Sequence, residues 1–138
     1  MRNILLLLWL FLFTACNTEN EPWTNSQLIE PSDLNIIISK QNKLPNIISV
    51  GPGKVIPNSI GVGECRYEKN LNILKNHLLS FSKDSEIILY CGCCPFKDCP
   101  NIRPAFSLLN SLGYKNHKLL NIRNNIKTDW IDMNYPID

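Results

Sequence analysis

The chain has 138 residues and a formal net charge of +2. A balance so close to zero gives no basis for nucleic acid or an acidic molecule as a partner, and we expect no nucleic acid to bind. The length suits one domain with a hydrophobic core.

The first fifteen residues have the features of an export signal. Arg2 precedes Ile4–Phe13, an apolar run of ten residues. Such a run is too short to span a bilayer, which takes about twenty residues, but it has the length of a signal-peptide core. Phe13-Thr14-Ala15-Cys16 then resembles the lipobox of bacterial lipoproteins, in which the cysteine becomes the lipidated first residue.

We therefore expect residues 1–15 to be a lipoprotein signal peptide and Cys16 to carry lipid. The protein would then be exported and anchored to the membrane, facing the periplasm or the cell surface. An ordinary secretory signal with a chance cysteine is the alternative. Residues 16–27 are polar and aperiodic, which predicts a tether whose Trp23 could touch the membrane interface.

Downstream of the tether, segments with a helical period alternate with short apolar runs that favour strands. Alternation of this kind predicts an α/β fold, one domain at 28–138 with a mostly parallel central sheet flanked by helices. Helices are expected at 31–40, 68–81, 104–112 and 127–133, strands at 46–50, 86–90 and 118–122, and a loop or short strand within 55–62.

Several side chains have an expected place in these elements. The helix at 68–81 is amphipathic and would bury one face. The helix at 104–112 would have Pro104 at its first position and Gly113, in a left-handed conformation, just after its end. The buried face of the helix at 68–81 would carry Leu71, Leu74, Leu78 and Leu79. Trp130 is expected in the core, and His77 and His117 are expected at the surface.

Four of the six cysteines lie within nine residues, from Cys91 to Cys99, between a predicted strand and a predicted helix. In parallel sheets, ligands bind at the carboxyl ends of the strands, where this loop begins. Loop amides and the positive end of the following helix both favour the ionised form of a cysteine. The segment is therefore expected to be a site for a nucleophilic thiolate.

The order of segments over residues 28–137 resembles the rhodanese-like family. The matching segments are LIEPSDL (28–34), NIISVG (46–51), EIILYCG (86–92) and WIDMNYPI (130–137), and CGCCPxxxCPNxRPA (91–105) resembles a subgroup of small exported members. The resemblance implies a rhodanese-like fold and a sulfurtransferase or related thiol enzyme that forms a persulfide on Cys91. Ser49 and Gly51 stand where the family usually has Asp and Arg.

In such an enzyme Cys91 would attack the outer sulfur of a small sulfur-donor or thiol substrate. Gly92, Lys97 and Arg103 are the candidate substrate-binding residues. Loop amides from Gly92 onward would stabilise the anion, and the two cations would hold an anionic donor. No cofactor is expected.

Three roles remain open for Cys93, Cys94 and Cys99. One is a resolving thiol that turns the persulfide into a disulfide. The second is a structural disulfide, such as Cys94 with Cys99. The third is a zinc or copper(I) site formed together with Cys91, which would make the domain a non-catalytic metal-binding module. Cys65 is expected to be a spare or buried thiol, or a partner for a loop cysteine.

Overall fold

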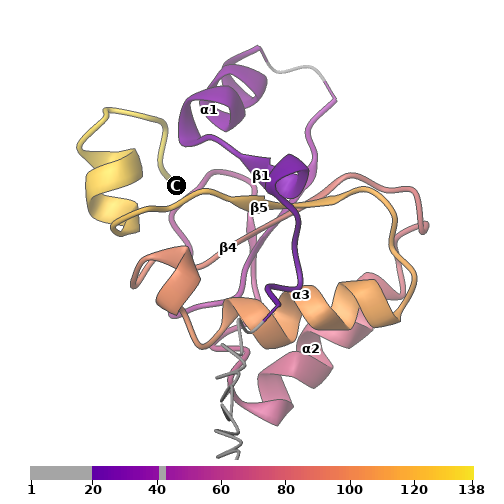
Figure 1. Ribbon diagram of the computed structural model, residues 1–138. Helices are drawn as coiled ribbons and strands as arrows, with labels where there is room; N and C mark the ends of the chain where they lie inside the picture. The colour runs from indigo at the N-terminus through magenta and orange to yellow at the C-terminus, as the bar shows by residue number, and fades with distance from the viewer. Residues whose placement is uncertain (1–19, 41–42) are drawn as a thin grey trace, which may run out of the picture.

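The computed structural model describes residues 20–40 and 43–138 (Figure 1). The predicted signal peptide, the predicted lipidation site Cys16 and the first residues of the predicted tether lie outside the described residues. None of the helices in the described part is long and apolar enough to cross a membrane.

Within the described residues, five strands form one sheet in the order β1-β5-β4-β2-β3, and every neighbouring pair is parallel. This confirms the predicted α/β fold with its mostly parallel sheet, and extends it to a sheet that is parallel throughout. The strands are β1 (Leu28–Ile29), β2 (Asn46–Ser49), β3 (Ile60–Gly61), β4 (Ile87–Tyr90) and β5 (His117–Leu120).

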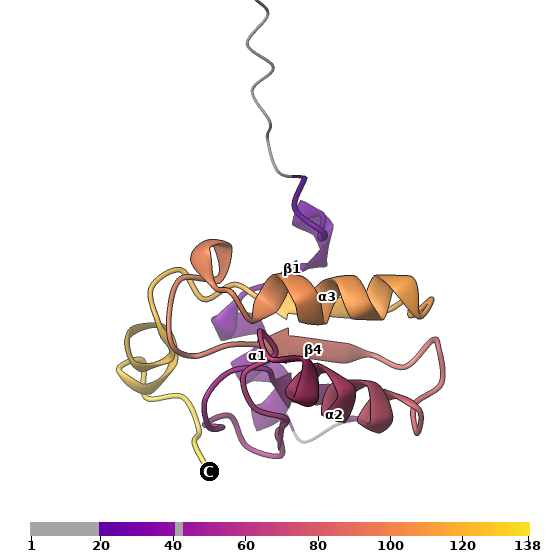
Figure 2. The same cartoon turned by 90° about the horizontal axis from the view of Figure 1, so that it is seen from below.

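Helices cover both faces of the sheet. One face carries α2 (Glu68–Leu78) and α3 (Ile102–Ser111), which run side by side across it (Figure 2). The other face carries α1 (Pro31–Ser39) and η3 (Lys127–Ile131), a π-helical segment near the C-terminus. Two single turns of 3₁₀-helix, η1 (Asn25–Gln27) and η2 (Phe96–Asp98), complete the described elements.

The sheet is buried on both faces, and strand alternation decides which face each side chain meets. Ile48, Leu89 and Leu119 belong to the cluster under α2 and α3. Their sequence neighbours Ile47, Ile88 and Leu120 belong to the cluster that contains Trp130 and the buried side of α1. The same alternation sends Tyr90 to the α1 side and Cys91 to the α2 and α3 side.

The helix ends differ in part from those expected. Gly113 has φ +77°, as predicted for the residue after α3. However, α3 begins at Ile102, so Pro104 is its third residue; a proline is tolerated there because the first N–H groups of a helix have no partner within it. The helix predicted over 68–81 ends at Leu78, and Leu79, just beyond that end, is 76% exposed instead of buried. Of the four leucines expected on the buried face, only Leu74 and Leu78 are fully buried.

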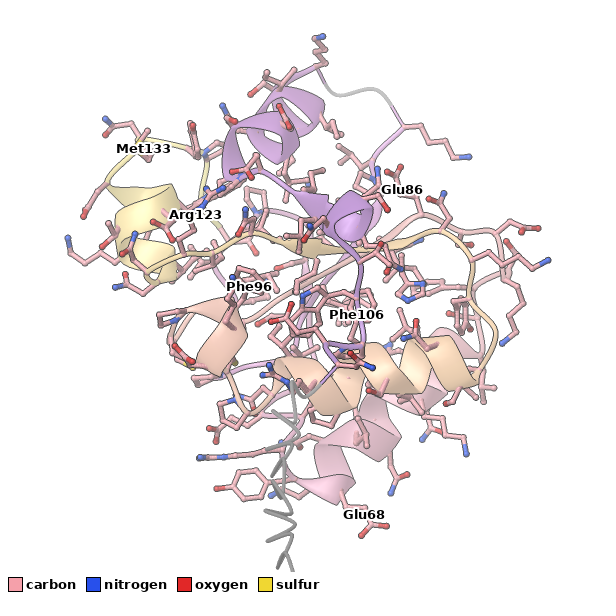
Figure 3. The ribbon with its side chains drawn as sticks, in the orientation of Figure 1. Glu68, Glu86, Phe96, Phe106, Arg123 and Met133 are labelled. Carbon is pink, nitrogen blue, oxygen red and sulfur yellow. The ribbon has the colours of Figure 1, made fainter. Side chains whose placement is uncertain are left out.

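Trp23 was expected in the tether, and this prediction is wrong. Trp23 is 5% exposed, and its ring centroid lies 5.7 Å from that of Phe96 in η2 and 5.8 Å from that of Phe106 in α3. Figure 3 labels these two phenylalanines. A tryptophan buries more apolar surface than almost any other side chain, so it docks here although its neighbours are polar. The domain therefore includes residues 23–27 as well as 28–138.

His117 was expected at the surface and is also buried, with 4% of its side chain exposed. It is the first residue of β5, two positions before Leu119, so it faces the same side as Leu119. Its ring packs against Phe106, and Nε2 lies 2.7 Å from Oδ1 of Asn110. Burial lowers the pKa of His117. His77 is exposed and Trp130 is buried, as expected.

Candidate functional site: a cluster of four thiols

Cys91 lies directly after β4, at the carboxyl edge of the sheet. The neighbouring strand β2 continues beside it, with the Val50 N–H donating to the Tyr90 carbonyl over 2.9 Å. The next residue, Gly51, passes so close that a Cβ there would be 2.4 Å from the Cys91 sulfur. Only a glycine leaves room for this sulfur, so two segments forty residues apart in sequence define its position.

The other three loop cysteines gather around Cys91. The Sγ atoms of Cys91 and Cys93 are 3.3 Å apart, and those of Cys93 and Cys94 are 3.1 Å apart. With Cys99 included, all four sulfurs lie within 4.8 Å of one another. Cys91 and Cys99 are buried, Cys94 is half-buried and Cys93 is exposed. The loop therefore presents one exposed sulfur above a buried pair.

Hydrogen-bond donors that converge on its sulfur favour the thiolate form of Cys91. The hydrogen bond from the Cys99 thiol lowers the pKa of Cys91 most, whereas burial raises it. The backbone N–H and the thiol of Cys93 and the Asn101 amide lower it further, and the resulting pKa of Cys91 is about 5. A free cysteine titrates near 8.5, so Cys91 is ionised at neutral pH. The expectation that loop amides stabilise this thiolate agrees with the Cys93 contact.

Asn101 is a residue of the site that sequence analysis missed. It is 1% exposed, and its Nδ2 lies 3.6 Å from the Cys91 sulfur. Its Oδ1 accepts a hydrogen bond from the Arg66 N–H over 3.1 Å, which fixes the orientation of the amide. The sequence holds one hint: Asn101 immediately precedes α3, where a side-chain amide often serves as a helix cap. Here it bonds to the thiolate and to the loop before α2 instead.

Three other thiols, those of Cys99, Cys93 and Cys65, favour the protonated form. Hydrogen bonding to Cys91, followed by burial, raises the pKa of Cys99 far above its usual range. Partial desolvation and contacts with Cys94 and Cys91 raise the pKa of Cys93 to about 12. Burial, with the nearby Cys91 charge, raises the pKa of Cys65 to about 12. All five cysteines in the described residues are free thiols, so the disulfide considered for Cys94 and Cys99 is not formed in this structure.

The three predicted substrate-binding residues take other contacts in the described structure. Gly92 packs against Ile126, and its carbonyl accepts the Ile126 N–H over 3.0 Å. The Arg103 guanidinium donates to the Lys97 carbonyl over 2.6 Å, lies 5.4 Å from the Trp23 ring and 3.8 Å from the Glu21 carboxylate. Arg103 thus fastens η2 to α3, and its role toward a substrate stays a prediction.

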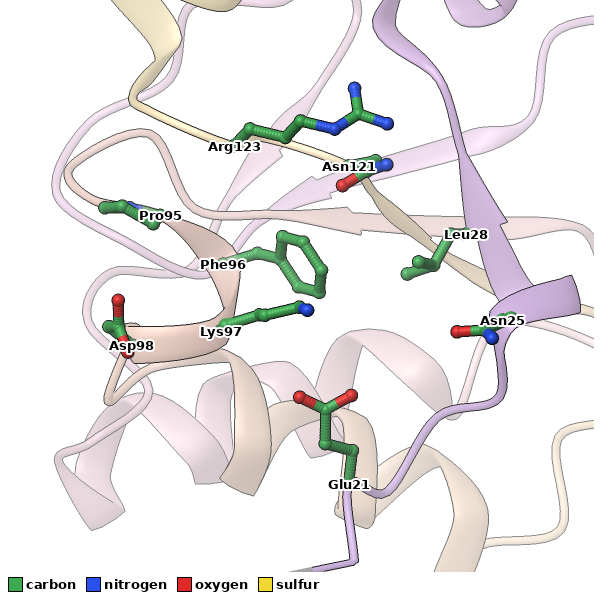
Figure 4. Close-up of a pocket in the computed structure, with 9 residues that line it drawn as sticks. All are labelled: Glu21, Asn25, Leu28, Pro95, Phe96, Lys97, Asp98, Asn121 and Arg123. Atoms are coloured by element: carbon green, nitrogen blue, oxygen red, sulfur yellow. The ribbon is translucent and has the colours of Figure 1, made fainter.

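Lys97 lies at a cavity of about 550 Å³ on another side of the loop (Figure 4). Its aliphatic chain lies beside Phe96, and the ammonium points across the cavity toward the Glu21 side. None of the cysteines lines this cavity, so Lys97 and the thiol cluster belong to different surfaces of the loop. The lining residues are Glu21, Asn25, Leu28, Pro95, Phe96, Lys97, Asp98, Asn121 and Arg123.

Chemically, the cluster offers two activities. A buried thiolate beside protonated thiols is suited to nucleophilic attack on sulfur. Four cysteine sulfurs within 4.8 Å could also bind a soft metal, since tetrahedral Zn–S bonds of about 2.3 Å separate the sulfurs by about 3.8 Å. Metal binding would then need only small side-chain movements.

Comparison with known proteins supports the fold. No family model matches the sequence, and no curated protein matches it. Among solved structures, a rhodanese-like domain from Anabaena sp., determined by solution NMR, matches with a TM-score of 0.58. The match covers 81% of this chain and 78% of that one at 14% identity. The chain therefore has a rhodanese-like fold, as the order of its sequence segments predicts.

Proposed function

We propose that this domain is a sulfurtransferase in which Cys91 takes a sulfane sulfur from a donor and carries it as a persulfide. The observation that carries the proposal is the convergence of donors from Cys93, Cys99 and Asn101 on one buried sulfur at the end of the central strand. These donors favour the thiolate, which is the form of Cys91 that attacks a sulfane sulfur. The rhodanese-like fold is consistent with this role.

The first step requires only the thiolate and a donor. With thiosulfate, the Cys91 thiolate attacks the outer sulfur, a new S–S bond forms, and sulfite leaves with the electron pair of the old one. The charge balances, since one persulfide anion and one sulfite replace one thiolate and one thiosulfate. The outer sulfur then leaves Cys91 in a second step, in which another nucleophile breaks the persulfide.

The test is the release of sulfite by the purified full chain during incubation with thiosulfate. Consumption of thiosulfate with release of sulfite should depend on Cys91 and be lost in Cys91→Ser. Cys94→Ser is the matched control, because Cys94 has no hydrogen bond with Cys91 in the structure and should retain the reaction. Equal loss in both variants would contradict a single nucleophile.

A second candidate function is the binding of a soft metal ion by Cys91, Cys93, Cys94 and Cys99. The observation that favours it is that their four sulfurs lie within 4.8 Å of one another. The four cysteines would then act as a set, because losing any thiolate opens the coordination shell. Native mass spectrometry separates the candidates: stoichiometric zinc or copper in the parent, with similar loss in all four serine variants, would support the metal site against sulfur transfer.

We also propose that the domain is anchored to a membrane through lipid on Cys16, as the lipobox-like motif predicts. The domain begins no later than Trp23. Residues 16–22 would therefore separate the lipid from the folded domain by at most about 25 Å of extended chain. This short spacing would keep the cysteine loop close to the membrane surface.

A further inference from the structure

We propose that Cys93 resolves the Cys91 persulfide, so that the sulfur leaves as hydrogen sulfide and an external dithiol reduces the resulting Cys91–Cys93 disulfide. This inference rests on the proposed formation of a persulfide at Cys91. It names what the proposed function leaves open: the released product is sulfide, and the second substrate is a thiol reductant rather than a sulfur acceptor.

The geometry of the pair makes this step short. The two sulfurs are 3.3 Å apart in the reduced structure, and a disulfide bond is about 2.0 Å long, so bond formation needs a movement of little more than 1 Å. The thiol is held beside its target by the chain, which makes the attack intramolecular and greatly raises its effective concentration. A persulfide on Cys91 would therefore meet Cys93 before it meets an acceptor from solution.

The step needs no further oxidant. Cys93 attacks the inner sulfur of the persulfide with its own electron pair and forms the new S–S bond. The outer sulfur leaves with the electron pair of the broken bond and takes the Cys93 proton, giving hydrosulfide. One persulfide anion and one thiol thus become one disulfide and one HS⁻, so atoms and charge balance.

The resting protonation of Cys93 is compatible with this step. Partial desolvation raises its pKa most, and contacts with Cys94 and with the charged Cys91 sulfur raise it further. Once Cys91 carries a second sulfur, the charge moves to the outer atom, and the inner atom no longer holds the Cys93 proton in place. The outer sulfur then becomes the natural acceptor for that proton.

Exposure determines how the disulfide is reopened. Cys93 is exposed, whereas Cys91 is 2% exposed, so an external thiol can reach only the Cys93 sulfur. Attack there expels Cys91 as the leaving group, and a leaving thiol with a low pKa departs fastest. The second thiol of the reductant then releases Cys93 and leaves as an oxidised disulfide, which returns both cysteines to the reduced state.

The test is a single turnover of the purified full chain with thiosulfate and no reductant, followed by intact mass and by assay of free sulfide and sulfite. The parent should release about one sulfide per chain and lose the mass of two hydrogens, with the bridge mapped to Cys91 and Cys93. Cys93→Ser should still release sulfite, but should gain the mass of one sulfur and release no sulfide. Asn72→Ala, at an exposed position of α2 outside the thiol cluster, is the control and should behave like the parent.

The outcomes distinguish this inference from the function on which it rests. A stable sulfur adduct in the parent would overturn the role of Cys93 and leave the sulfurtransferase standing. Sulfide release from Cys93→Ser equal to that of the parent would assign resolution to another thiol and would also overturn the inference. If neither parent nor Cys93→Ser releases sulfite, the proposed function itself fails, and the inference with it. Because Cys93 is exposed, a thermal melt of Cys93→Ser should match the parent.

Discussion

At the scale of single residues, the chemistry of the site depends on a few donors aimed at one sulfur. Among the groups that lower the pKa of Cys91 in the described structure, Asn101 alone is not a cysteine. Its amide is fixed from the other side by the Arg66 N–H. The neutral amide of Asn101 is therefore held in the orientation in which it donates to the Cys91 sulfur.

The thiolate of Cys91 should persist to mildly acidic pH. Its pKa is lowered, so the charged form is present above about pH 5 and is lost as pH falls through that value. The ultraviolet absorbance of the thiolate, taken as the difference between parent and Cys91→Ser, should titrate with a midpoint near 5. Asn101→Ala should move the midpoint upward, whereas Asn72→Ala, at an exposed position of α2, should not. A parent midpoint near 8.5, that of a free cysteine, would refute this account.

Gly51 should resist even the smallest substitution. In Gly51→Ala the new Cβ would meet the Cys91 sulfur at 2.4 Å, so the sulfur or the backbone must move. Overpacking of this kind costs about 1–3 kcal/mol of unfolding free energy, measurable by urea denaturation. Gly61→Ala is the matched control, because its Cβ would meet Lys54 at an ordinary 3.8 Å. Equal stability of the two variants would contradict the close approach of β2 to Cys91.

At the scale of elements, the cysteine loop is held in place by η2 and its contacts. The Phe96 N–H donates to the Ile122 carbonyl over 2.9 Å, beyond the end of β5. The Phe96 ring packs on Trp23, and Arg103 binds the Lys97 carbonyl. The N-terminal segment, α3 and the chain after β5 thus all brace the loop that carries the thiols.

We expect the stability of the cysteine loop, and of the domain, to depend on the packing of Trp23 against Phe96. Truncating a buried aromatic side chain costs about 3–5 kcal/mol, so Trp23→Ala should lower the urea midpoint strongly. Trp23→Phe should restore much of the loss, because the buried indole N–H has no hydrogen-bond partner to lose. If Trp23→Ala unfolds at the parent's midpoint, the segment does not belong to the core.

At the scale of the whole molecule, the fold places the thiol cluster at one edge and the N-terminal segment beside it. The carboxyl ends of parallel strands share that edge, so the loop after β4 and the turn after β2 meet there. Trp23 contacts η2 from the N-terminal side. A lipid on Cys16 would therefore tether the molecule close to its own reactive loop.

Membrane attachment is expected to depend on Cys16. When the chain is produced in a bacterium, Cys16→Ser should lose lipid addition and should shift the protein out of the washed membrane fraction, as judged by immunoblotting. Cys94→Ser changes a cysteine of the loop and should leave the protein in the membrane fraction. A Cys16→Ser protein that is cleaved and remains membrane-bound would rule out the lipid anchor.

Local patterns were sufficient for much of the fold. The apolar runs of β2 and β4 and the helical spacing of α1 and α2 are properties of a few consecutive residues, so the sequence predicts them. The two-residue strand β1 has no such pattern, since it exists only because it pairs with β5. The predicted position of Cys91 after β4 is correct, because the continuous apolar run directly before it forms a buried strand.

The sequence alone determined that the chain alternates strands and helices, that its segments follow the rhodanese-like order, and that four cysteines occupy one loop. Tertiary structure decided which groups surround the Cys91 sulfur. Gly51 approaches it from the turn after β2, and Asn101 approaches it from the residue before α3. It also decided that Trp23 and His117 are buried. Burial depends on partners distant in sequence, and no local pattern of polarity specifies where those partners will lie.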